Sequence, residues 1–137
     1  MKNFFFLLIL LFSFVSLSCD RDDSNYLTEF EEGQFEGEFI RSSPWGFYVP
    51  SDVSLTLRNG NFEGTSSRAK FPAICRGTYI VDGNEIHFQN ECPWTAEFDW
   101  SLILSGTFTY QIVEGELYLF KGDHEGILDN YQLSLTN

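Results

Sequence analysis

The chain has 137 residues, of which 20 are acidic and 8 are basic, and its formal net charge at neutral pH is −12. Such a charge repels the phosphate backbone of nucleic acids, which proteins bind through clustered Lys and Arg. It also opposes contact between the protein surface and anionic lipids. We therefore expect no nucleic-acid partner, and the length fits one domain of ordinary size.

The N-terminal segment is predicted to be a signal peptide, because Lys2 precedes an apolar run over residues 4–17 that only two serines interrupt. The run is short for a membrane-spanning helix, which needs about 20 apolar residues. It ends in Ser16-Leu17-Ser18-Cys19, which resembles the bacterial lipobox, although that family usually carries Leu where Ser16 stands here. The resemblance implies that residues 1–18 are removed and that Cys19 bears a lipid anchor. An ordinary cleaved signal before an unmodified cysteine is the alternative.

A charged segment without apolar periodicity follows, and it predicts a solvated tether over residues 19–32. Three acids occur in Asp20-Arg21-Asp22-Asp23. Such a cluster resembles an export signal to the outer cell surface in the lipoproteins of some Gram-negative groups, whereas Asp directly after the cysteine resembles an inner-membrane retention signal in others. We expect a lipid-anchored, surface-exposed protein of the outer membrane, with the periplasmic face or a plain spacer as alternatives. The mature chain would keep 7 basic and all 20 acidic residues, for a net charge of −13.

Residues 33–137 are predicted to form one all-β domain, because polar and apolar residues alternate in short runs separated by Gly, Asn and Asp. The first expected strand covers residues 34–41, and Gly37 within it permits a sharp bend. The second begins at residue 53 and reaches Asn59-Gly60, a dipeptide well suited to a two-residue hairpin. This turn places Leu57 opposite Phe62.

Two further hairpins are expected, with turns at Gly83-Asn84 and Glu114-Gly115. The first register pairs Tyr79 with Phe88, and the second pairs Ile112 with Leu117, so that each apolar set lies on one face. A turn at Asp82-Gly83 or a three-residue loop would shift the first register. The last two expected strands, over residues 100–105 and 130–136, have these apolar residues in phase: Trp100, Leu102 and Leu104, then Tyr131, Leu133 and Leu135.

Cys75 and Cys92 are predicted to form a disulfide. The same hairpin register places them opposite each other, which brings the α-carbons of antiparallel strands within bridging range. If Cys19 carries lipid, these two cysteines are an even pair in an oxidising compartment. Two buried free thiols are the alternative.

Short antiparallel strands leave exposed edges unless the sheet closes, so the sequence predicts a small up-and-down barrel of eight or nine strands, with a sandwich as the alternative. Gly33-Gln34-Phe35-Glu36-Gly37 and the hairpin over residues 77–86 resemble the small lipocalin-like barrels of Gram-negative lipoproteins. True lipocalins carry Trp where this chain has Phe35. The resemblance implies a non-enzymatic binding module that holds a small apolar ligand inside the barrel or at its mouth. Inward aromatic side chains could instead fill the interior.

The chain has no motif typical of an enzyme: no Gly-x-Ser-x-Gly turn, no phosphate-binding Gly-Lys-Ser loop and no His-Glu-x-x-His helix. His87 falls on the outward face of its hairpin. His124 lies in a Gly-bounded polar loop, which is more typical of a turn than of a metal site. Glu97 and Asp99 are predicted on one strand face, where solvated acids are common on so acidic a surface. We therefore expect no catalytic residue, metal or cofactor.

Aromatic residues stand out in two connections that are otherwise polar. Trp94, Phe98 and Trp100 lie in one, and Trp45 lies in the other. Trp offers a large contact area at a small entropic cost, so these side chains predict a rim at the barrel mouth that binds a ligand or a partner. A lid that plugs the end of the barrel is the alternative.

Two other functions are also compatible with the sequence. One is a protein-interaction module for a basic protein, which the negative charge would attract. Ser105-Gly106-Thr107-Phe108 resembles a Ser-Gly-containing strand of Gram-negative lysozyme inhibitors, which are also small lipoprotein barrels. The other is a structural accessory of a larger envelope complex, with no ligand of its own.

Overall fold

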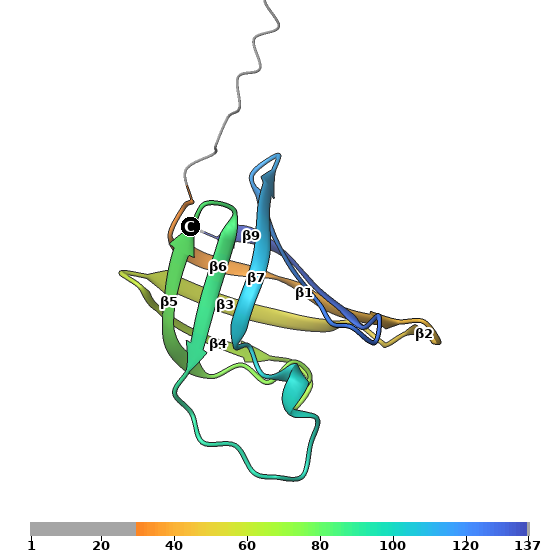
Figure 1. The fold of residues 1–137 in the computed structure, drawn as a ribbon. Coiled ribbons are helices and arrows are strands. Elements are labelled where there is room, and N and C mark those ends of the chain that lie inside the picture. The colour runs from red at the N-terminus through yellow and green to blue at the C-terminus, as the bar shows by residue number, and fades with distance from the viewer. Residues whose placement is uncertain (1–29, 137) are drawn as a thin grey trace, which may run out of the picture.

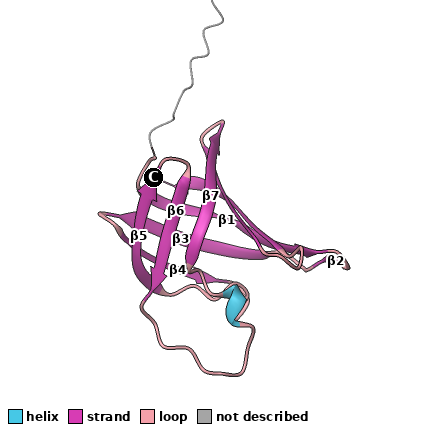
Figure 2. Ribbon diagram, in the orientation of Figure 1, coloured by secondary structure: helices cyan, strands magenta, loops and turns pink. Residues whose placement is uncertain are grey.

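A computed structural model describes residues 30–136 (Figures 1 and 2). The predicted signal peptide, the predicted lipidation site Cys19 and most of the predicted tether lie outside the described residues. Within them, no helix is long and apolar enough to cross a bilayer. The elements are β1 (Gly33–Ser43), β2 (Gly46–Phe47), β3 (Ser51–Arg58), β4 (Asn61–Ser66), β5 (Arg76–Asp82), β6 (Glu85–Asn90), the 3-10 helix η1 (Trp100–Leu102), β7 (Gly106–Val113), β8 (Glu116–Gly122) and β9 (Leu128–Thr136).

The strands form a closed antiparallel barrel, which confirms the predicted fold. From β3 to β9 each strand pairs with the next one along the chain, β1 pairs with β3, and β1 also pairs with β9 to close the sheet. The two-residue strand β2 extends the far end of β1, where Ser42 pairs with Phe47. Eight strands therefore make the barrel wall, and β2 adds a short flap at one rim.

All three predicted hairpin registers are confirmed. Leu57 pairs with Phe62, Tyr79 with Phe88, and Ile112 with Leu117. At the first turn both central residues have positive φ, 52° at Asn59 and 72° at Gly60, as a tight hairpin turn between twisted strands requires. Because Asp82 pairs with Glu85, the second turn is at Gly83-Asn84, and the alternatives with a shifted register are excluded.

The interior of the barrel is filled by its own side chains. The ring centroid of Phe88 lies 5.2 Å from that of Phe62 and 5.7 Å from that of Phe108, and the Phe39 and Tyr131 centroids are 4.8 Å apart. An eight-stranded barrel is just wide enough for side chains to fill it in this way. The buried hydrophobic residues of the barrel strands are Phe35, Phe39, Val53, Leu55, Leu57, Phe62, Tyr79, Ile86, Phe88, Phe108, Leu117, Leu119, Tyr131 and Leu133.

The predicted strand over residues 100–105 is wrong. Residues Trp100–Leu102 form η1, and the only strand-like contact that follows is an isolated bridge between Ile103 and Ala73. Leu102 and Leu104 are buried as predicted, but Trp100 is 56% exposed. Asp99 caps the start of the helix, because its carboxylate accepts a hydrogen bond from the backbone N–H of Ser101. Asp99 and Glu97 therefore do not share a strand face.

The two ends of the barrel differ in character (Figure 1). The three tight turns lie at one end, here called the hairpin end, where the described chain also begins. Phe30 packs against the rings of Tyr79 and Tyr110 there, so the last residues of the predicted tether contact the barrel. Hydrogen bonds from the Asn59 N–H and the Tyr79 hydroxyl lower the pKa of Glu32.

The four longer connections meet at the opposite end, here called the loop end: residues 44–50, 67–75, 91–105 and 123–127.

Candidate binding surface at the loop end

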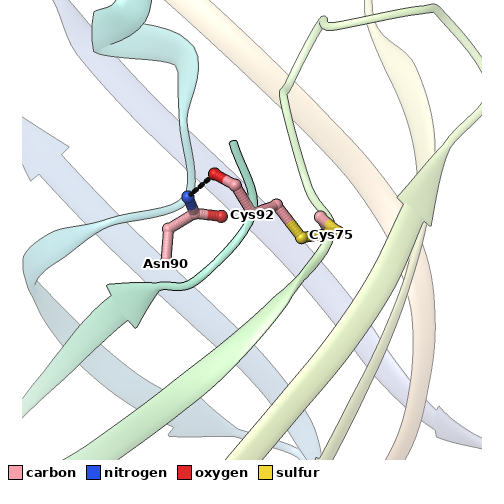
Figure 3. The surroundings of a disulfide bond; sticks show 3 residues. All are labelled: Cys75, Asn90 and Cys92. Carbon is pink, nitrogen blue, oxygen red and sulfur yellow. Dashed lines mark hydrogen bonds between the residues drawn. A yellow bond between two sulfur atoms is a disulfide. The ribbon is translucent and has the colours of Figure 1, made fainter. Parts of the chain in front are cut away.

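A disulfide bond restrains the start of the connection over residues 91–105. The predicted disulfide between Cys75 and Cys92 is present, with the α-carbons 6.3 Å apart (Figure 3). Pairing between β5 and β6 ends at Gly77 and Asn90, so the bridge lies just beyond the strand ladder. The side-chain amide of Asn90 donates a hydrogen bond of 2.8 Å to the carbonyl of Cys92. Together these bonds fix where the connection starts.

A buried arginine holds the other part of the same connection. Arg41, on β1, is 3% exposed, and its guanidinium donates to both carboxylate oxygens of Asp129 at 2.6 and 2.8 Å. The same group donates to the Asp99 carboxylate at 2.8 Å and to the Ser101 hydroxyl at 2.9 Å. Arg41 therefore ties η1 to the barrel wall through planar, charge-assisted hydrogen bonds.

The ionisation of this cluster follows from its contacts. Burial by itself would lower the pKa of Arg41, but hydrogen bonds and charge from Asp129 outweigh it and raise the pKa above its ordinary value. Burial would raise the pKa of Asp99, yet hydrogen bonds from Ser101 and the charge of Arg41 lower it on balance. Both groups are thus held in their charged forms.

Three adjacent strands contribute to a row of charges across the inward face of the loop end. Lys121 on β8 pairs with Asp129 on β9, and Asp129 pairs with Arg41 on β1. On each of these strands the alternate residues that face inward are mostly apolar. The inward-facing residue at the loop end is charged. The sequence reasoning missed this cluster, although the two-residue period of each strand places all three side chains inward.

The structure brings together three of the four predicted rim residues. The ring centroids of Trp94 and Phe98 are 5.6 Å apart, and those of Phe98 and Trp100 are 6.5 Å apart in a stacked arrangement. The ammonium group of Lys70 lies 4.9 Å from the Phe98 centroid. Trp45 instead lies at the turn between β1 and β2, where it is 83% exposed. The rim is thus an aromatic cluster on one connection and a separate exposed turn on another.

An open groove of about 530 Å³ lies beside the aromatic cluster. Lys121 lies on its wall and donates a hydrogen bond of 2.7 Å to the carbonyl of Ser105. Burial lowers the pKa of Lys121, against the opposing effect of Asp129. The groove therefore combines indole surface with a half-buried amine. Its lining residues are Asn90, Cys92, Pro93, Trp94, Trp100, Ile103, Ser105 and Lys121.

Neither histidine is part of the groove lining. His87 is exposed on the outward face, where its Nδ1 is 3.0 Å from the Thr107 hydroxyl. His124 is in the turn between β8 and β9, in which the Asp123 carboxylate accepts hydrogen bonds from two backbone N–H groups. Among residues 30–136, no group of three His, Cys, Asp or Glu side chains is placed to hold a metal ion.

No protein-family model, curated protein or solved structure matches this chain. The closed antiparallel barrel is compatible with a lipocalin-like fold. A small barrel of this kind is compatible with a binding module.

Proposed function

We propose that this protein is an envelope lipoprotein whose barrel is a non-enzymatic binding module for a small apolar ligand. The observation that carries the proposal is the loop-end groove, whose walls include Trp94 and Trp100. Its volume of about 530 Å³ lies in the range of small-molecule sites, roughly 300–1,000 Å³. Since side chains fill the interior, the ligand would bind in this groove at the mouth.

In this proposal the anchor at Cys19 lies on the outer membrane and the domain is exposed at the cell surface. The end of the barrel at which the tether enters fits this arrangement. Residue 30 lies at the hairpin end, and Cys19 precedes it by 11 residues, which reach at most about 40 Å when fully extended. Because the tether enters there, the hairpin end would lie on the membrane side, and the acidic residues that gather at it would keep the domain off the surface of an anionic bilayer. The groove, at the opposite end, would then face away from the membrane. The acids in question are Glu31, Glu32, Asp82, Glu85, Glu114 and Glu116.

The anchor is tested by Cys19→Ala, which should move the protein from the membrane fraction to the soluble fraction. Each buried methylene of an acyl chain contributes about 0.8 kcal/mol to membrane binding, so loss of the acylated cysteine removes the main attachment. Fractionation followed by immunoblotting measures the change. Ser24→Ala, in the same tether, should leave the protein membrane-bound. A Cys19→Ala protein that stays with the membrane would refute the anchor.

The groove is tested by titrating the mature chain carrying Cys19→Ala with an uncharged fluorescent apolar probe, N-phenyl-1-naphthylamine. Trp94→Ala and Trp100→Ala should each weaken binding at least about tenfold, because truncating a contact Trp commonly costs 2 kcal/mol or more. Trp45→Ala, which removes an exposed indole outside the groove, is the matched control and should bind as the parent does. Thermal melts establish that the variants are folded. Equal affinities in all four proteins would refute the groove as the site.

A protein-interaction module is the second candidate, and a different surface favours it. Trp45, at the turn between β1 and β2, is 83% exposed, Phe47, on β2, is 85% exposed, and Val49, just after β2, is 68% exposed. Exposed apolar clusters of this kind often mark contact sites for other proteins. With a charge of −13, the partner would be a basic protein, and its association would slow as salt rises. Salt-sensitive binding of a basic lysozyme that Trp45→Ala abolishes would favour this candidate.

A further inference from the structure

The groove differs in charge from the rest of the molecule. Acidic residues outnumber basic ones by 20 to 8 in the chain, yet the lining of the groove includes one lysine and no acidic side chain. An acidic protein that presents a cation beside two indoles offers a local site for a negative charge next to an apolar body. The overall charge of the protein would otherwise repel such a ligand.

Lys121 has unused hydrogen-bonding capacity. A lysine ammonium has three N–H donors, and one of them is directed at the carbonyl of Ser105, 2.7 Å away. Asp129, its neighbour on β9, has both carboxylate oxygens engaged by Arg41. Within residues 30–136, the ion pairs are those of Arg41 with Asp99 and Asp129, and neither includes Lys121. The amine is thus half-buried without a carboxylate in contact.

The ammonium lies 5.3 Å from the centroid of the Phe108 ring, and the charge of nearby Asp129 offsets part, but not all, of the cost of its partial desolvation. The burial that lowers the pKa of Lys121 has this physical meaning, because it disfavours the charged form. An anion that entered the groove would restore the missing partner. One cation on the wall matches one negative charge on the ligand.

We propose that the groove binds a long-chain monocarboxylate, with its chain against Trp94 and Trp100 and its carboxylate hydrogen-bonded to Lys121 Nζ. The proposal rests on the proposed function and adds the chemistry of the ligand's head group. Charge-assisted hydrogen bonds to a carboxylate are stronger than neutral ones, so the anion should bind more tightly than an uncharged molecule of the same length.

The test compares dodecanoate with dodecanol as competitors for the fluorescent probe on the mature chain carrying Cys19→Ala. Dodecanoate should bind at least tenfold more tightly than dodecanol. Lys121→Met should remove this preference, because it should weaken dodecanoate binding much more than dodecanol binding, whereas Lys121→Arg should retain a preference for the anion. Arg68→Met, which removes an exposed cation outside the groove lining, is the matched control for net charge and should keep the preference.

The outcomes separate this proposal from the one on which it rests. If both competitors displace the probe with equal affinity, or if Lys121→Met keeps the preference for dodecanoate, the carboxylate proposal is overturned and the apolar groove stands. If the probe binds but neither competitor displaces it, a long-chain ligand is excluded altogether. Failure of the probe itself to bind would overturn the proposed function and this inference with it.

Discussion

Arg41→Met is expected to lower the free energy of unfolding by about 3–5 kcal/mol, the usual cost of breaking a buried ion pair on one side only. Asp129 is 6% exposed and accepts two hydrogen bonds from the guanidinium, so the substitution would leave a buried carboxylate without its cation. The loss also removes the hydrogen bonds that Asp99 and Ser101 receive from Arg41. Urea-induced unfolding, followed by far-ultraviolet circular dichroism, measures the effect.

Two comparisons make this expectation specific to the buried pair. Arg58→Met removes an exposed arginine from β3 and should change stability by less than about 0.5 kcal/mol. The double variant Arg41→Met with Asp129→Leu should recover much of the loss, because removing both partners leaves no unpaired buried charge. A single-variant loss below about 1 kcal/mol would show that water or a rearranged cation replaces Arg41.

Gly37→Ala is expected to cost about 3 kcal/mol, at the upper part of the range for overpacking. Gly37 pairs with Leu133 at the contact between β1 and β9 that closes the barrel. A β-carbon at this position would overlap the carbonyl oxygen of Gln132 and lie 2.9 Å from its carbon and 3.0 Å from the α-carbon of Leu133. These are backbone atoms, so relief requires the two strands to separate.

Gly122→Ala is the matched control, because it also adds one methyl group to a barrel strand. The nearest atom to a β-carbon there is the Ile127 carbonyl oxygen at 3.8 Å, which is ordinary contact. Its stability should stay within about 1 kcal/mol of the parent, with a small gain from reduced freedom of the unfolded chain. If Gly37→Ala proved as stable as Gly122→Ala, the strands would be shown to part at little cost.

The sequence carries enough information to predict the barrel wall. Turn dipeptides such as Asn59-Gly60 fix where hairpins reverse, and a two-residue period then decides which side chains face inward. A register error of one residue would have exposed Leu57 and Phe62, so the requirement that apolar side chains face inward tests the predicted register. The bridge between Cys75 and Cys92 follows from the same register, although it lies just beyond the last paired residues.

The loop end was harder to predict because its structure depends on contacts between distant residues. Trp100, Leu102 and Leu104 alternate as a strand would, but Asp99 and Ser101 are held by Arg41, some 60 residues earlier in the chain, and the backbone turns into η1 instead. The same limit applies to the row of Lys121, Asp129 and Arg41. The period of each strand could show that its charged residue faces inward. That the three residues are neighbours depends on the pairing of β9 with both β8 and β1.

In the proposed function, the ligand binds at the mouth of the barrel and not in its interior. The three tryptophans give separate indole N–H signals for a direct test by nuclear magnetic resonance, in which dodecanoate is titrated into the mature chain carrying Cys19→Ala. Trp94 and Trp100 line the groove, so their signals should shift with saturation, while the Trp45 signal should stay in place. Shifts confined to methyl groups of buried interior residues such as Leu55 and Leu133, with the indole signals of Trp94 and Trp100 unmoved, would contradict the claim.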